Sequence, residues 1–127
     1  MTSKLILGFV GLPASGKGTA AEYLKTKYGA NTFRYSTMLW DLLTRLYLEP
    51  TRDNLIKMSE CVREKFGEDT MAKVITKDVE NSQNKLIIVE GIRRMADIEY
   101  MDKLPNFILV EIFADIEKRY KRIMVFR

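Results

Sequence analysis

A glycine-rich stretch near the start of the chain, residues 11–19 with the sequence GLPASGKGT, combines residue types that bind phosphate. It fits the pattern G-x-x-x-x-G-K-[ST], except that Gly18 stands in the place of Ser or Thr and Thr19 follows one position later. The glycines let several backbone N–H groups point inward, and Lys17 adds a mobile positive charge for the outer phosphates of a nucleotide. The residues expected to hold the nucleotide are Gly11, Pro13, Ala14, Ser15, Gly16, Lys17, Gly18 and Thr19.

The segments on either side of this loop agree with that reading. Leu5–Val10 is apolar without alternation, which is typical of a buried parallel strand, and Ala20–Lys25 favours a helix. A helix N-terminus adds partial positive charge to a phosphate site. The alternative is a chance glycine-rich turn, but such a turn would not be expected to follow a strand and lead directly into a helix.

Glu90 is the first candidate metal-binding residue, because it ends a second buried apolar run, Leu86–Val89. Its carboxylate would hold Mg²⁺ through bound waters, since Mg²⁺ keeps much of its hydration in protein sites. The hydroxyl of Thr19 is the second candidate. The alternative for Glu90 is a solvated side chain at a strand end.

Arginines and hydroxyls after the predicted strands are candidates for binding the acceptor. Arg93 and Arg94 follow Glu90, and a guanidinium fork donates two parallel hydrogen bonds to a phosphate. Ser36 and Thr37 follow the predicted strand at residues 32–35, although helix capping explains them equally well.

Composition narrows the chemistry. The chain has 127 residues, a net charge of +4, no histidine and one cysteine, Cys61, which we expect to be packed in a helix. Histidine base chemistry, histidine-bound zinc, an internal disulfide and a cysteine-cluster metal site are therefore excluded. The positive charges are spread among acids, which favours a small phosphate-rich ligand over nucleic acid. No run is long enough to span a membrane and no signal peptide is visible, so we expect a cytoplasmic protein.

The order of predicted elements indicates a three-layer α/β/α fold in one domain, residues 1–127, with a parallel sheet of about four strands. Residues 37–80 form a predicted helical insertion for the acceptor between strands two and three. The remaining strand is predicted at 107–113, and short helices at 95–102 and after Asp115. Ligands of such sheets bind at the carboxyl ends of the strands, where the glycine-rich loop and Glu90 both fall.

The loop G-x-P-x-S-G-K-G-T resembles that of P-loop nucleoside monophosphate kinases of the adenylate kinase type. Glu90-Gly91-Ile92-Arg93-Arg94 resembles their D-G-F-P-R turn, in which Arg94 matches the arginine that binds the acceptor phosphate. Arg93 instead matches the D-G-I-R variant of proteins similar to dephospho-coenzyme A kinase, and it is the one we favour. The resemblance implies ATP and Mg²⁺ as cofactors and Arg122 as a further catalytic arginine beside Lys17 and Arg93.

The predicted function is phosphoryl transfer from ATP to a small phosphate-bearing acceptor, chiefly a ribo- or deoxyribonucleoside monophosphate, by a monomer or homodimer. Phosphorylation of a hydroxyl, as in dephospho-coenzyme A, is an alternative that needs a carboxylate base, for which Asp41 is the candidate. Arg63 lies in the insertion and could also face the acceptor, but we expect it on a solvated helix face. The family continues into a lid and a last strand that this sequence lacks, so an ATP-binding module without turnover is another alternative.

Overall fold

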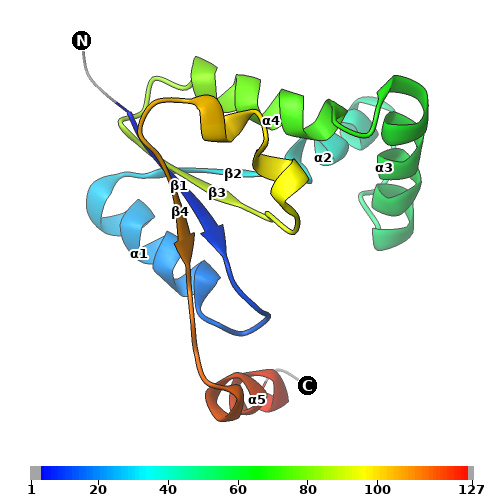
Figure 1. The fold of residues 1–127 in the computed structure, drawn as a ribbon. Coiled ribbons are helices and arrows are strands. Elements are labelled where there is room, and N and C mark those ends of the chain that lie inside the picture. Colours follow the sequence, from blue (N-terminus) through cyan, green and yellow to red (C-terminus); the bar gives the residue numbers. More distant parts are fainter. Residues whose placement is uncertain (1–3, 126–127) are drawn as a thin grey trace.

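The computed structural model describes residues 4–125, with side chains as far as residue 121. Strands and helices alternate around one sheet, and α5 stands away from it (Figure 1). Short 3-10 helices, η1 and η2, follow β3. In chain order the elements are β1 Leu5–Val10, α1 Lys17–Tyr28, β2 Asn31–Arg34, α2 Thr37–Arg45, α3 Arg52–Phe66, α4 Thr70–Asn81, β3 Leu86–Glu90, η1 Met95–Ile98, η2 Met101–Lys103, β4 Phe107–Glu111 and α5 Ile116–Val125.

The sheet has four strands in the order β2-β3-β1-β4, and every pairing between them is parallel. The central strand β1 pairs with β3 through Gly8 and Val89 and with β4 through Val10 and Glu111. Because all strands run the same way, the glycine-rich loop after β1 and the turn after β3 leave the sheet at one edge. The predicted α/β fold with a parallel four-stranded sheet is confirmed.

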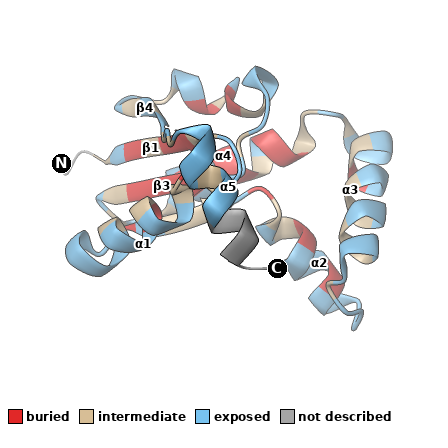
Figure 2. Ribbon diagram, turned by 90° about the horizontal axis from the view of Figure 1, so that it is seen from below, coloured by how far each residue is buried: buried red, intermediate tan, exposed pale blue. Residues whose placement is uncertain are grey.

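The two faces of the sheet bury different strand residues. The buried residues of the sheet lie in β1 and β3 (Figure 2). Ile6, Ile87 and Val89 face the core under α2, α4 and the 3-10 helices. Phe9 and Ile88 face the other core, under α1. Buried apolar side chains of this kind contribute about 1.5–3 kcal/mol each, so the sheet is fixed from both sides. The result is the expected three-layer arrangement.

The helical block differs in detail from the sequence prediction. The helix α4 lies on the sheet as part of a layer, burying Ile75 and Val79, while α3 projects to the side (Figure 1). The helix α3 begins with a side-chain cap, because the Thr51 hydroxyl accepts a hydrogen bond from the Asn54 N–H at 3.1 Å. The prediction for Cys61 is wrong: the thiol is exposed, since α3 turns the neighbouring Val62 toward the core instead.

Two boundaries also move. The single helix predicted at 95–102 is two 3-10 turns, η1 and η2, and the last strand ends at Glu111 instead of residue 113. The exposed Phe113 lies beyond the β1 pairing, which explains the shorter strand. None of the described helices is long and apolar enough to cross a membrane.

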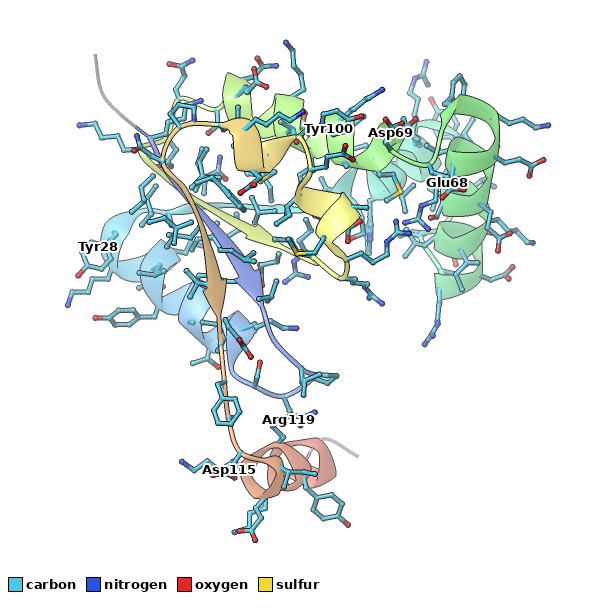
Figure 3. The ribbon with its side chains drawn as sticks, viewed as in Figure 1. Tyr28, Glu68, Asp69, Tyr100, Asp115 and Arg119 are labelled. Carbon is cyan, nitrogen blue, oxygen red and sulfur yellow. The ribbon has the colours of Figure 1, made fainter. Side chains whose placement is uncertain are left out.

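A polar cluster ties the start of α4 to the 3-10 helices. The Tyr100 hydroxyl donates to the Asp69 carboxylate, and Lys73 lies 3.1 Å from the same carboxylate (Figure 3). The hydrogen bond from Tyr100 and that from Lys73 lower the pKa of Asp69 below its ordinary value of 3.8. The ammonium of Lys73 also lies 5.5 Å from the centre of the Tyr100 ring, a cation–π contact.

A lowered carboxyl pKa makes a prediction about stability and pH. The contribution of ionised Asp69 is present above pH 3.8 and is lost as the pH falls through the lower pKa of the folded state. Asp69→Asn should therefore lower Tm by a few degrees at pH 6 and by much less at pH 3. Thermal unfolding followed by circular dichroism measures this, with the exposed Asp102→Asn as the control. An equal loss at both pH values would contradict the account.

Candidate active site

The loop between β1 and α1 forms a backbone cradle. Ala14 and Gly16 have positive φ angles of 62° and 105°, and the Ser15 N–H donates to the Leu12 carbonyl at 3.1 Å. Ser15 is buried, and its hydroxyl oxygen has no hydrogen-bond partner among the described residues. A buried hydroxyl without a partner costs about 1–3 kcal/mol, which an anion in the cradle would recover. The loop thus fits a phosphate group.

Gly11 permits a close approach that no other residue allows. A Cβ atom placed there would lie 2.5 Å from the Ile112 carbonyl oxygen and 2.7 Å from the Ser15 hydroxyl. The space is occupied by the segment after β4, so the loop is fitted against the neighbouring strand. Gly18, by contrast, lies in the first turn of α1, where a Cβ would meet nothing within 4 Å.

Lys17 lies where the hollows of the site meet. Its ammonium donates to the Gly11 carbonyl, so the side chain folds back over the loop. It lines an open hollow of about 1280 Å³ between α1 and β4, together with Ala14–Ala20 of the loop and helix, and we call this space the loop hollow. It also lines a second pocket, of about 600 Å³, on the other side of β1. One lysine therefore serves both spaces.

The second pocket is rich in arginine and we call it the arginine pocket. It lies between the carboxyl ends of β2 and β3 and the helices α2, α3 and α4, and it carries five cationic residues against two carboxylates. Its lining residues are Lys17, Arg34, Tyr35, Ser36, Leu39, Arg63, Met71, Glu90, Gly91, Arg93, Arg94 and Asp97.

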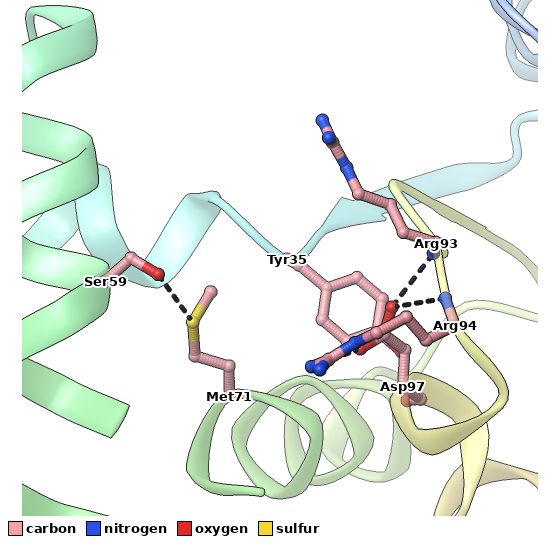
Figure 4. Close-up of polar contacts among 6 residues, drawn as sticks. All are labelled: Tyr35, Ser59, Met71, Arg93, Arg94 and Asp97. Atoms are coloured by element: carbon pink, nitrogen blue, oxygen red, sulfur yellow. Dashed lines mark hydrogen bonds and ion pairs between the residues drawn. The ribbon is translucent and has the colours of Figure 1, made fainter. Parts of the chain in front are cut away.

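Asp97 holds the turn that presents the arginines. Its carboxylate accepts hydrogen bonds from the backbone N–H groups of Arg93 and Arg94 at 2.9 and 3.0 Å (Figure 4). The Tyr35 hydroxyl donates to the Asp97 backbone carbonyl, which connects β2 to η1. Burial, and then the nearby Asp97 charge, raise the pKa of the Tyr35 phenol, so it remains a neutral donor. The positions of both arginines are therefore set by one carboxylate.

Removing this carboxylate has a measurable consequence. Asp97→Ala should cost about 2–3 kcal/mol in unfolding free energy, because two backbone donors lose a charged acceptor. The larger effect should be on KM for the acceptor, a rise of about 10-fold with a smaller change in kcat, since Arg93 and Arg94 lose their fixed backbone. Urea unfolding and steady-state kinetics measure the two effects, with Asp102→Ala as the control. An unchanged KM would show that the turn does not depend on Asp97.

The structure separates the two predicted metal-binding residues. Glu90 lines the arginine pocket, with its carboxylate 3.5 Å from Arg34, whereas Thr19 is exposed in the hollow beside α1. Among the described residues, no three His, Cys, Asp or Glu side chains gather as a metal site. Any Mg²⁺ here would therefore depend on phosphate oxygens and water for most of its ligands.

The two hydroxyl residues that were predicted to bind the acceptor, Ser36 and Thr37, are also placed differently. Ser36 lines the arginine pocket and is the N-cap residue of α2, but its side chain makes no capping hydrogen bond. Thr37 starts α2 and is not among the residues that line the pocket. Asp41 is exposed on α2, and its charge contributes, after burial, to the raised pKa of Asp78 on α4. The arginine pocket is thus lined by Ser36 but not by Asp41.

One arginine of α5 reaches the loop. The Asp115 carboxylate accepts from the Lys118 N–H at 2.8 Å and so caps α5. Arg119 Nε donates to the Pro13 carbonyl at 2.9 Å (Figure 3). The side chain of Arg122, the predicted catalytic arginine, lies outside the described residues. Arg119 therefore links α5 to the phosphate-binding loop.

Sequence reasoning missed three pocket residues. Arg34 ends β2 and pairs with Glu90, and Asp97 holds the turn. The expectation of a solvated face for Arg63 is wrong, because this side chain lines the arginine pocket and is only partly exposed. Its position next to Val62, on the apolar side of α3, is the sequence signal that would have identified it.

A parallel sheet whose first strand leads through a phosphate-binding loop into a helix defines a P-loop α/β protein of the kinase-like type. A family model described as "AAA domain" matches residues 10–124, and the chain belongs to that family. Solved structures agree on the fold. Shikimate kinase from Acinetobacter baumannii, in complex with shikimate, aligns over 95% of this chain and 63% of its own with a TM-score of 0.54 and 16% identity. TT1252 from Thermus thermophilus aligns over 97% and 72% with a TM-score of 0.57 and 17% identity.

Curated relatives are closer in sequence. The UPF0200 protein of Methanothrix thermoacetophila is 34% identical over 119 residues, which cover 93% of this chain and 64% of that protein. The UPF0200/UPF0201 protein of Archaeoglobus fulgidus is 32% identical over 122 residues, which cover 93% of this chain and 38% of that protein. The chain thus spans less than two thirds of the length of these relatives.

Proposed function

We propose that this chain transfers a phosphoryl group from ATP to a small acceptor that itself carries a phosphate, chiefly a ribo- or deoxyribonucleoside monophosphate. One observation carries the proposal: Lys17 lines both the loop hollow and the arginine pocket. A lysine at that junction is close to a phosphate bound on either side. This is the geometry that transfer between two bound phosphates requires.

The residues of the chain would act by position and charge. The loop N–H groups and Lys17 hold the donor phosphates, and Arg93, which we favour over Arg94, orients the acceptor phosphate. An acceptor phosphate is already an anion near neutral pH, so no strong base is needed, and the chain has no histidine. Ser36 would contribute a hydroxyl to the acceptor, and Arg122 a further positive charge near the transferred group.

Mg²⁺ fits this site as an ion held mainly by phosphate oxygens and water, with Glu90 as the protein residue that would contact its water shell. When bound, it would supply charge neutralisation between the outer phosphates. Thr19 would then contact the donor phosphates from the other side of the loop. We further propose that the chain works in the cytoplasm as a monomer or homodimer, on small molecules rather than nucleic acid.

The open hollow beside the loop favours a second candidate, an ATP-binding module that needs a further segment for turnover. This hollow is lined on one side by Val110 and Ile112, at the end of β4, and on the other by Tyr23 and Leu24 of α1. Water that enters beside a bound triphosphate would weaken charge stabilisation there. The hydroxyl acceptor of the dephospho-coenzyme A type has less support, because its candidate base, Asp41, does not line the acceptor pocket.

The deciding experiment is ADP formation from Mg·ATP with a panel of acceptors: every ribo- and deoxyribonucleoside monophosphate, dephospho-coenzyme A and shikimate. We expect turnover that requires a nucleoside monophosphate. Turnover only with a hydroxyl acceptor would replace this proposal by the second kinase class. ATP binding without turnover on any acceptor would leave the binding module.

A further inference from the structure

We infer that Arg63, on α3, binds the phosphate of the acceptor together with Arg93 and so makes a doubly charged anion the requirement for binding. The inference deepens the proposed function and rests on it. It assigns a specific residue of the helical block, an arginine on α3, to the acceptor phosphate.

The first observation is an unsatisfied charge. The Nε atom of Arg63 is buried and has no hydrogen-bond partner among the described residues. A guanidinium donor that is removed from water without an acceptor is costly to keep. Arg63 lines the arginine pocket and also a smaller adjoining one of about 220 Å³, so it stands where the two spaces join. An anion bound on the arginine-pocket side would satisfy the donor, whereas the smaller space is lined by the carboxylates of Glu68, Asp69, Asp97 and Glu99 and would repel one.

The second observation is the balance of charge in the arginine pocket. Arg34 lies 3.5 Å from Glu90, and Arg94 lies 3.6 Å from Asp97, so each carboxylate of the pocket has an arginine partner. Three cationic side chains then remain. Lys17 belongs to the loop, which leaves Arg63 and Arg93 for the acceptor. Two guanidinium groups match the charge of a phosphate dianion.

The third observation is that helix packing holds Arg63 in place. One turn earlier on α3, the Ser59 hydroxyl contacts the sulfur of Met71 at 3.8 Å, which joins α3 to α4 (Figure 4). The adjacent residue, Val62, is buried in the core. The helix is therefore anchored in the turn that leads up to Arg63. Anchoring of this kind reduces the entropy lost when a ligand binds.

The test measures phosphate binding in the absence of ATP. In a Lys17→Ala background, which removes the lysine of the loop, inorganic phosphate is titrated by isothermal calorimetry at low ionic strength. We expect Arg63→Gln to weaken the remaining phosphate binding at least about 10-fold, the loss of one charged hydrogen-bond donor set. Arg52→Gln, an exposed arginine at the start of the same helix, should bind phosphate like the parent.

A second measurement separates binding from folding. Because the buried Nε of Arg63 has no partner among the described residues, Arg63→Gln in phosphate-free buffer should unfold at a Tm at least as high as that of the parent. A lower Tm would indicate a structural role and overturn the inference, as would unchanged phosphate affinity or a parent that binds no phosphate. The acceptor panel is independent of this titration. If no acceptor supports turnover but phosphate binding still depends on Arg63, the proposed kinase activity is rejected and the proposed phosphate site stands.

Discussion

Lys17→Ala should lower kcat/KM for ATP by about 1000-fold, the loss expected when a charged group that stabilises the transition state is removed. The physical reason is the position of the ammonium at the junction of the loop hollow and the arginine pocket. No other lysine lines the arginine pocket in the described part of the chain, so the lost charge has no local replacement. The rate of ADP formation with the best acceptor of the panel measures the effect.

The matched control is Lys25→Ala, an exposed lysine near the end of the same helix. It should leave both rate and Tm nearly unchanged. A Lys17→Ala enzyme that keeps more than a tenth of its activity would contradict the role given to this residue. A large fall in Tm, or the loss of the folded circular dichroism spectrum, would show instead that the substitution damages the fold.

Gly11→Ala should abolish nucleotide binding although it adds one methyl group. The new Cβ would stand 2.5 Å from the Ile112 carbonyl oxygen, a backbone atom that cannot turn aside. The loop must therefore shift, and a displacement of about 1 Å can cost about 100-fold in rate. We expect the affinity for ATP to fall at least about 100-fold, measured by calorimetry, with a loss of stability of about 1–3 kcal/mol from overpacking.

Gly18→Ala is the stability control for this prediction. A Cβ there meets nothing within 4 Å, and the position is helical. Alanine is better than glycine in a helix by about 1 kcal/mol, so Gly18→Ala should be as stable as the parent or more so. If both glycine variants lost the same stability, the steric account of Gly11 would fail.

The parts that the sequence predicted correctly are those whose signals are local. The apolar runs of β1 and β3 are continuous, and the spacing of the phosphate-binding loop lies within nine consecutive positions, 11–19. Glu90 was found at a strand end for the same reason. Backbone periodicity and short motifs act within one element, so one sequence is enough to recognise them.

The arginine pocket could not be predicted in full because it is assembled from elements that lie far apart in the sequence. Arg63 and Arg93 are thirty positions apart in number, and no periodicity relates α3 to the turn after β3. The role of Asp97 depends on backbone donors of a turn, which carry no side-chain signature. Cys61 and Arg63 lie on either side of the buried Val62 of α3, and the sequence does not show which of the two neighbours turns inward.

The hydrogen bond from Lys17 to the Gly11 carbonyl means that the proposed binding of a nucleotide at this loop would be an exchange reaction. A phosphate oxygen must displace a carbonyl oxygen that already holds the ammonium, so part of the enthalpy of the new contact is cancelled. In return, the side chain has already lost much of its rotamer freedom before the ligand arrives. Selectivity follows from this competition: a weakly charged anion gains little by replacing the carbonyl, whereas a triphosphate gains enough.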